Sequence, residues 1–267
     1  MSYDFVIVGG GSAGSTMASR LTEDPNVSVC LLEAGGDGNG ILVRAPAGVV
    51  AMLPGRPKIN KWAFNTESQP GLNGRRGYQP RGKALGGSSA INAMLYVRGQ
   101  KEDYDNWADL GNEGWDWDSV LPYFKKAENN SRGADAAHGD SGPLQVSDQK
   151  APRPISEAYI QACTQMQLHR TQDFNGGDNE GAGYWQTTIH HSPEKNGERC
   201  SAAAGYLFPV MDQRANLTVI TKAHATRIIF DGKRAVGVAY RQGKQDKEVR
   251  AGKEVILCGG AFQSPQL

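Results

Sequence analysis

The stretch YDFVIVGGGSAGSTMASRLT, residues 3–22, decides the fold. Its first part, Tyr3–Val8, is apolar and rich in β-branched residues, which is typical of a buried parallel strand. Glycines at the spacing Gly-x-Gly-x-x-Gly follow, and Ser15–Thr22 is predicted to be a helix. A second predicted strand, Val27–Leu32, leads into Glu33, about twenty residues after the glycines. A glycine turn between a strand and a helix, with an acid at this distance, predicts a dinucleotide-binding βαβ unit.

The residue types in this unit have physical reasons. We expect Gly9 to make the tight turn, Gly11 to let a pyrophosphate approach the backbone, and Gly14 to let the helix pack close to the strand. The helix N-terminus presents free N–H groups and a positive dipole to phosphates. The Glu33 carboxylate can accept hydrogen bonds from a ribose diol, which favours FAD or NAD over NADP.

A second glycine-rich stretch, PRGKALGGSSAINAMLYVRG, occupies residues 80–99. Glycine lets a backbone approach a ligand without a Cβ in the way. A loop this bare, carrying Arg81 and Lys83, fits a flat, bulky and anionic ligand. The apolar run Ala93–Val97 that follows is strand-like. A simple dinucleotide domain has no place for such a loop, so an NAD-dependent enzyme is the least expected alternative.

Together, the two stretches resemble the glucose–methanol–choline (GMC) oxidoreductases, which are FAD-dependent enzymes that oxidise alcohols. The run Gly82–Asn92 is similar to the first signature of that family, and Gly260–Leu267 is similar to the beginning of the second. The resemblance covers the whole chain. Within the family, the sequence is most similar to bacterial choline and aliphatic alcohol dehydrogenases.

The resemblance implies that FAD is the cofactor. Gly82–Ser88 would follow the pyrophosphate and ribityl chain, and the backbone at Ala225 would meet the adenine. Asn92–Met94 would lie against the isoalloxazine, where backbone N–H groups can stabilise negative charge. Ile91 stands where some relatives carry a histidine that binds FAD covalently, so a non-covalent flavin is predicted. The expected cofactor contacts are Gly9, Gly11, Ser12, Ala13, Gly14, Glu33, Ala34, Trp62, Arg81, Gly82, Ala84, Gly86, Gly87, Ser88, Asn92, Ala93, Met94, Ala225, Gly260 and Ala261.

The expected fold is α/β: a Rossmann-like, mainly parallel FAD-binding sheet with helices on both faces, an antiparallel β-meander, and part of an α+β substrate domain. Residues 1–150 would form the first part of the FAD-binding domain, and residues 197–267 the second part. Residues 151–196 would belong to the substrate domain.

The meander is predicted from three short strands near the C-terminus, with Asp231-Gly232 as a hairpin turn. A separate buried strand, Glu254–Cys258, would follow it. The three meander strands are Ala225–Phe230, Ala235–Tyr240 and Lys247–Ala251.

Other chemistry-bearing residues have plainer interpretations. Neighbouring side chains on a strand point to opposite faces, so His190-His191 is interpreted as a surface or pocket-edge pair and no metal site is expected. Asp118 is expected to cap a helix, in preference to a sugar site built from the Trp and Asp residues around it. His224 is expected to be structural. Cys258 is interpreted as a small buried hydrophobe, although fatty-acid photodecarboxylases of this family also carry a cysteine in the matching strand.

Composition bounds the remaining possibilities. A net charge of +1 over 267 residues gives no reason to expect a nucleic-acid partner. The four cysteines are scattered without metal-ligand spacing, which predicts free thiols in a reducing compartment. The sequence shows no signal peptide and no apolar stretch long enough to span a bilayer. We therefore expect a cytoplasmic protein, with peripheral contact at the inner face of the membrane left open.

The expected reaction is FAD-dependent oxidation of a primary alcohol, choline or an aliphatic or aromatic alcohol, to its aldehyde. Hydride would pass to flavin N5 and electrons to a quinone-like acceptor. None of the five histidines matches the family's catalytic base, so no catalytic residue is assigned. The sequence stops inside the second signature, which predicts a missing C-terminal half or a complementary chain, and an isolated chain that is poorly soluble and inactive. An O₂-using oxidase, a fatty-acid photodecarboxylase and an inactive flavin-binding chain are the alternatives.

Overall fold

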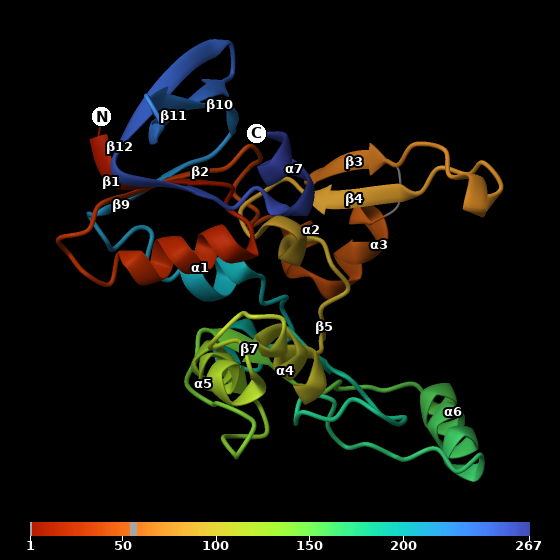
Figure 1. Ribbon diagram of the computed structural model, residues 1–267. Coiled ribbons are helices and arrows are strands. Elements are labelled where there is room, and N and C mark those ends of the chain that lie inside the picture. The colour runs from red at the N-terminus through yellow and green to blue at the C-terminus, as the bar shows by residue number, and fades with distance from the viewer. Residues whose placement is uncertain (1, 54–57) are drawn as a thin grey trace. The chain divides into compact units, whose positions relative to one another are not determined.

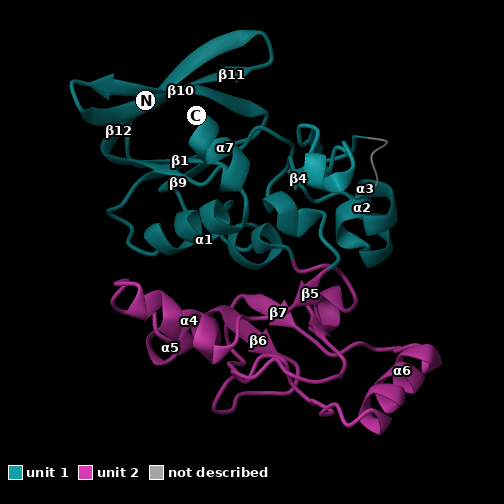
Figure 2. Ribbon diagram, turned by 45° about the vertical axis from the view of Figure 1, so that its right-hand side comes forward, with its two compact units in different colours: residues 1–93, 201–267 teal, residues 94–200 magenta. Residues whose placement is uncertain are grey.

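The computed structural model describes residues 2–53 and 58–267. The chain forms two compact units (Figure 2): unit 1 comprises residues 1–93 and 201–267, and unit 2 comprises residues 94–200. The chain therefore leaves unit 1 once and returns to it. The functional domain limits expected at residues 150 and 196 stay a prediction, and the compact units divide at other positions.

Unit 1 is built on a six-stranded sheet with the order β10-β11-β12-β1-β2-β9 (Figure 1). The four strands β12, β1, β2 and β9 run parallel, whereas β10, β11 and β12 form an antiparallel meander. This confirms the mainly parallel α/β fold with a meander. The bounds are β1 Ser2–Val8, β2 Val29–Leu32, β9 Leu217–Ile220, β10 Ala223–Asp231, β11 Arg234–Gln242 and β12 Gln245–Leu257.

The two faces of this sheet carry different layers. Alternate strand residues point to opposite faces, so Ile7 packs with Ala18 of α1 and with Leu207 on one face. On the other face Val6 packs with meander residues such as Val238 and Tyr240. Helices were expected on both faces, and this second face packs against the curled meander instead. The helices of unit 1 are α1 Ser12–Leu21, α2 Ile41–Arg44, α3 Val49–Met52, α7 Gly260–Gln266, the 3₁₀ turns Pro46–Gly48, Pro70–Leu72 and Gly87–Ala90, and a π-helix at Ala203–Leu207.

The C-terminal strands differ from the prediction in one respect. Asp231 ends β10 and Gly232, with φ +58°, lies in the turn, as predicted. The strands predicted at 247–251 and 254–258, however, are one continuous strand, β12. Its first part pairs with β11 and its last part with β1, and an extra residue between Ala251 and Glu254 makes a bulge opposite Tyr3–Phe5. The chain changes partner without ending the strand because a bulge absorbs the change in register.

Unit 2 has short strands and three helices. One predicted helix cap is wrong: Asp116, not Asp118, is the N-cap of α5. The Asp116 carboxylate accepts hydrogen bonds from the Ser119 N–H at 2.9 Å and from the Ser119 hydroxyl at 2.7 Å. The helix begins two residues earlier because Trp117 is its first buried residue. The elements are α4 Lys101–Asp109, α5 Trp117–Ala127, α6 Pro154–Gln165, β5 Leu95–Tyr96, β6 Glu128–Asn130, β7 Leu144–Val146, β8 Gln186–Thr187 and a 3₁₀ turn at Pro193–Lys195.

A two-stranded hairpin, β3 Lys61–Asn65 with β4 Tyr78–Gly82, completes unit 1. It leads into the second glycine-rich stretch, because the last three residues of β4, Pro80–Gly82, are also the first three of that stretch. Within residues 2–53 and 58–267, no helix has the length and apolar character needed to cross a bilayer.

Candidate cofactor-binding site

The two glycine-rich loops pack backbone against backbone in unit 1. The N–H of Gly86 donates a hydrogen bond to the carbonyl of Gly10 at 2.7 Å. Gly87 has φ +55°, and a Cβ built on it would lie only 2.6 Å from the Cα of Gly11. Neither contact leaves room for a side chain. The loops Gly9–Gly14 and Gly82–Ser88, which begin 73 residues apart in sequence, therefore act as one surface, which we call the glycine cradle.

The first and third glycines of the N-terminal loop have the roles that were predicted for them. Gly9 has φ +102°, and a Cβ there would meet the carbonyl oxygen of Cys258 at 2.4 Å. A Cβ on Gly14 would lie 1.9 Å from the carbonyl oxygen of Gly9. The tight turn and the close approach of α1 to β1 both depend on the missing side chains, which confirms the expected geometry of these two positions.

The middle glycine differs from its neighbours. Gly11 has φ −75°, a backbone conformation that alanine also adopts. A Cβ on Gly11 would touch only the Cα of Gly87, at an ordinary 3.7 Å. The protein itself therefore does not require glycine here. What a Cβ would fill is the space of the cavity that Gly11 lines, which is the fit expected for a group that approaches this backbone closely.

A cavity of about 960 Å³ lies over the glycine cradle, entirely within unit 1. A volume of this size is at the upper end of small-molecule and cofactor sites. It reaches from the loop after β1 to α7 and the beginning of β10. The predicted contacts that line it are Gly9, Gly11, Ser12, Ala13, Glu33, Ala34, Trp62, Arg81, Gly82, Gly87, Ser88, Ala225, Gly260 and Ala261.

Glu33 is buried at the edge of this cavity. Its two carboxylate oxygens accept hydrogen bonds from the N–H of Gly35 at 2.7 Å and the N–H of Gly10 at 2.9 Å. Burial raises the pKa of Glu33, and these two hydrogen bonds partly offset the rise. A carboxylate has more lone pairs than these two bonds use, so Glu33 can hold the loop and still accept a hydroxyl from the cavity.

Aromatic rings and cations form one wall of the cavity. The rings of Trp62 and Phe64 stack with centroids 6.0 Å apart, and the ammonium of Lys83 lies 4.0 Å from the Trp62 ring centre. The Arg81 guanidinium lies 4.4 Å from the centre of the Phe262 ring. Cationic groups held beside a cavity by cation–π contacts suit an anionic ligand with a planar part.

Several lining residues were missed by the sequence analysis. Phe64 lies two residues from Trp62 on β3, so period-two alternation could have found it. His224 contacts Trp62 edge-on, with centroids 5.5 Å apart. Phe262 lies inside the second signature, and Cys258 lies two residues before its first residue, Gly260. Burial raises the pKa of the Cys258 thiol, which opposes its ionisation.

The remaining predicted contacts do not line the cavity. Gly14 and Gly86 belong to the glycine cradle, and their close contacts described above are with the backbone of Gly9 and Gly10. Ala84 is fully buried and bridges to Gly36. The Asn92 N–H donates to the carbonyl of Ser88 at 2.9 Å, and Ala93 ends the first segment of unit 1. For these residues and for Met94, which begins unit 2, cofactor contact stays a prediction.

Met94 has an unusual backbone. Its φ is +64°, a left-handed conformation that non-glycine residues rarely adopt. The Met94 carbonyl accepts hydrogen bonds from the N–H of Thr188 at 2.8 Å and the Thr188 hydroxyl at 3.3 Å. Strained backbone of this kind persists where its surroundings hold it.

The histidines and cysteines considered as candidate functional residues have plainer environments. His190 is buried rather than at the surface, and burial lowers its pKa, while the Nε2 of His191 lies 3.0 Å from the carbonyl of Asn129. Across the described part of the chain, no group of three or more His, Cys, Asp and Glu is placed to hold a metal ion. All four cysteines are free thiols.

Comparison with known proteins gives one consistent family. The GMC oxidoreductase model matches residues 3–267. The chain is 45% identical to an alcohol dehydrogenase [acceptor] of Pseudomonas putida, over 99% of this chain and 47% of that protein. It is 46% identical to an oxygen-dependent choline dehydrogenase of Pseudomonas syringae pv. syringae, over 99% of this chain and 46% of that protein.

Solved structures agree with this match. The crystal structure of pyridoxine 4-oxidase from Mesorbium loti superposes with a TM-score of 0.91 and 36% identity, covering 98% of this chain and 50% of that one. An FAD-dependent oxidoreductase from Chaetomium thermophilum gives a TM-score of 0.89 at 33% identity, over 99% of this chain and 46% of that one. The chain spans about half the length of the curated relatives it matches.

Proposed function

Since the chain belongs to the GMC oxidoreductase family, we propose that it is the FAD-binding part of an enzyme that oxidises a primary alcohol to its aldehyde. The observation that carries the proposal is the cavity over the glycine cradle, where two loops distant in sequence meet through close backbone contacts. FAD, when bound, supplies the acceptor for the hydride that leaves the alcohol carbon.

The residues of unit 1 fit FAD in chemistry as well as in space. The first residues of α1, Ser12 and Ala13, line the cavity. The free N–H groups at a helix N-terminus favour the binding of a pyrophosphate. Arg81 and Lys83 add positive charge at the aromatic wall, and Glu33 offers acceptor capacity for a ribose hydroxyl. In this proposal the backbone at Ala225 contacts the adenine, and Gly82–Ser88 lie along the pyrophosphate and the ribityl chain.

The chain's own role is to bind and orient the cofactor. At Gly9, Gly11, Gly82 and Gly87 the glycine cradle presents backbone without side chains to the cavity, which leaves room for phosphates to approach closely. We assign no proton acceptor among these 267 residues, because none of the five histidines matches the family's catalytic base. No residue described above is therefore named catalytic.

The electron acceptor and substrate are the finer part of the proposal. We assign a quinone-like acceptor, in line with a relative named alcohol dehydrogenase [acceptor]. We assign a choline-like, aliphatic or aromatic primary alcohol as substrate, in line with that relative and with one named oxygen-dependent choline dehydrogenase, whose name also favours O₂ as the acceptor. The second candidate is an O₂-using oxidase, which is favoured by structural neighbours named pyridoxine 4-oxidase and formate oxidase. Stopped-flow mixing of the reduced protein with O₂ separates them, since slow reoxidation is expected of the dehydrogenase.

The purified protein should carry a flavin absorption spectrum, and acid precipitation should release all of that flavin into the supernatant. Ile91 offers no nucleophile for a covalent bond, so the flavin is held by contacts that denaturation destroys. Free FAD taken through the same precipitation gives the reference recovery. A flavin that stays in the protein pellet would contradict the non-covalent assignment, and a protein that binds no flavin would contradict the proposed function itself.

A further inference from the structure

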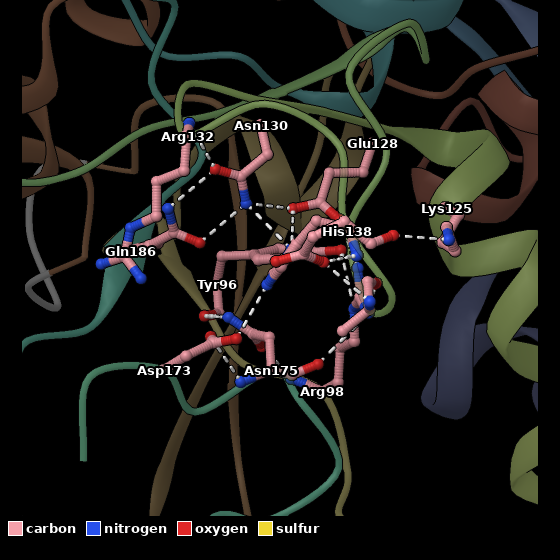
Figure 3. Close-up of polar contacts among 12 residues, drawn as sticks. Tyr96, Arg98, Lys125, Glu128, Asn130, Arg132, His138, Asp173, Asn175 and Gln186 are labelled. Atoms are coloured by element: carbon pink, nitrogen blue, oxygen red, sulfur yellow. Dashed lines mark hydrogen bonds and ion pairs between the residues drawn. The ribbon is translucent and has the colours of Figure 1, made fainter.

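A buried charged cluster in unit 2 has no part in the cofactor cavity (Figure 3). The side chains of Arg98, Glu128 and His138 are 1%, 0% and 2% exposed, and the cluster also includes Asp173. Arg98 forms an ion pair with Glu128 through Nη2 and donates from Nη1 to the carbonyl of Ala137 at 2.7 Å. Buried charges are costly unless they are paired and hydrogen-bonded, so this arrangement calls for a reason.

The geometry around His138 fixes its charge. Its Nδ1 lies 3.0 Å from Glu128 Oε1, and its Nε2 lies 2.8 Å from Asp173 Oδ2. A neutral imidazole would turn a lone pair toward one of these carboxylates, whereas an imidazolium donates to both. The amide of Asn130 lies 3.0 Å from Nδ1, but its hydrogens have nearer acceptors in Glu128 at 2.6 Å and Gln186 at 2.9 Å.

The charges facing His138 come from several elements. The hydrogen bonds to Asp173 and then to Glu128 raise the pKa of His138 to about 9, against the effect of burial. With His138 protonated, two cations balance two carboxylates in the cluster. At the rim of the cluster, Arg132 forms an ion pair with Asp148. The Asp135 carboxylate accepts a hydrogen bond from the backbone N–H of His138, and Lys125 donates to the backbone carbonyls of residues 135 and 136.

Two routes lead from this cluster to the start of unit 2. Asp173 accepts the N–H of Asn175, whose side chain accepts from the N–H of Arg98 at 2.9 Å and donates to the carbonyl of Tyr96 at 3.3 Å. On the other side, Gln186 of β8 bonds to Asn130. Two residues further on, Thr188 holds the carbonyl of the strained Met94.

We infer that His138, held as an imidazolium between Glu128 and Asp173, is a positioning residue for the segment from Met94 to Arg98. The inference rests on the proposed function and on the family resemblance, which implies that Asn92–Met94 lie against the isoalloxazine. The cluster fixes β5 through Asn175 and β8 through Gln186, so the left-handed backbone of Met94 is kept in place. Loss of the proton leaves one cation against two carboxylates, of which Glu128 is fully buried and Asp173 is partly exposed, and loosens both routes.

The first test reads the charge of His138 directly. In ¹⁵N-histidine spectra of the protein, one ring should show both nitrogens protonated at neutral pH and lose a proton only as the pH passes about 9. That signal should be absent from His138→Gln and present in His169→Gln, a matched change at an exposed histidine of the same unit. A His138 ring that is neutral at pH 7 would overturn the inference whether or not the protein binds FAD.

The second test separates positioning from a merely structural role. FAD dissociation constants are measured for the wild type, His138→Gln and His169→Gln, with urea unfolding beside them. His138→Gln should bind FAD about tenfold more weakly at neutral pH, a loss of about 1.4 kcal/mol, while His169→Gln binds like the wild type. A folded His138→Gln with wild-type FAD affinity would contradict positioning.

If His138→Gln does not fold, the wild-type pH profile decides. The FAD dissociation constant of the wild type and of His169→Gln should then rise as the pH passes about 9, and a flat profile through that range would overturn the inference. A wild type that binds no FAD at all would contradict the proposed function, and the ring spectra would still report the charge of His138.

Discussion

Replacing Gly14 with alanine should unfold unit 1 or destabilise it by more than about 4 kcal/mol, a loss that is exceptional for a single substitution. The new Cβ would lie 1.9 Å from the carbonyl oxygen of Gly9 and 3.1 Å from its carbonyl carbon. Both atoms belong to the backbone turn that joins β1 to α1, so no flexible side chain can move aside. Urea unfolding followed by far-UV circular dichroism measures the change.

Gly36→Ala is the matched control for this substitution. A Cβ on Gly36 would have nothing within 4 Å, although the residue lies in the loop after β2, close in sequence to Glu33. Its unfolding midpoint should stay at the wild-type urea concentration. A Gly14→Ala protein that unfolds at the same midpoint as Gly36→Ala would show that α1 does not pack against β1 as described.

Replacing Glu33 with alanine should cost roughly 2–6 kcal/mol, since it leaves two buried N–H groups without their acceptor at about 1–3 kcal/mol each. These are the N–H groups of Gly10 and Gly35, which lie on either side of the cavity edge. The same substitution removes the acceptor proposed for the ribose, so FAD affinity should fall together with stability. Denaturant unfolding and an FAD titration measure the two effects.

Glu67→Ala provides the comparison at the surface. The Glu67 side chain is 84% exposed and pairs with Arg76, and exposed pairs of this kind contribute little to stability. Its unfolding and FAD affinity should match the wild type. If Glu33→Ala were as stable as Glu67→Ala, the two N–H groups would have other partners and the structure of the loop would be wrong.

Local pattern was enough to predict the cofactor unit. The prediction of a βαβ unit in residues 3–33 rested on a short stretch in which strand, glycine turn, helix and acid follow one another. The tight turn at Gly9 and the close packing at Gly14 could be predicted from it, and the structure supplies the atoms involved. The hairpin at Asp231-Gly232 was found for the same reason. Each of these features is decided by residues that are neighbours in sequence.

Contacts between distant residues could not be predicted in this way. His138 stands in a polar segment outside any helix or strand, yet it is buried and contacts Glu128 and Asp173 from other parts of the chain. No local pattern predicts that pairing. The packing of Gly87 on Gly11 is likewise set by tertiary structure, although the resemblance to a family indicated that both loops serve one cofactor.

Boundary errors have their own physical causes. β12 continues through Gly252 because its last residues find a new partner in β1, which no property of the strand itself reveals. Asp116 caps α5 in place of Asp118 because the hydrogen bonds to Ser119 fix the first turn. Both acids are suitable caps by type, so the choice between them depends on where Trp117 is buried.

The central claim is that the two glycine loops form one cradle for FAD, and Gly11→Ala tests it most directly. The added methyl group would meet only the Cα of Gly87 at 3.7 Å, so the unfolding free energy should stay within about 1 kcal/mol of the wild type, as for a substitution at a helix N-cap. FAD titrations should nevertheless give an affinity at least about tenfold lower, a difference of about 1.4 kcal/mol. A Gly11→Ala protein that binds FAD as tightly as the wild type would contradict the claim.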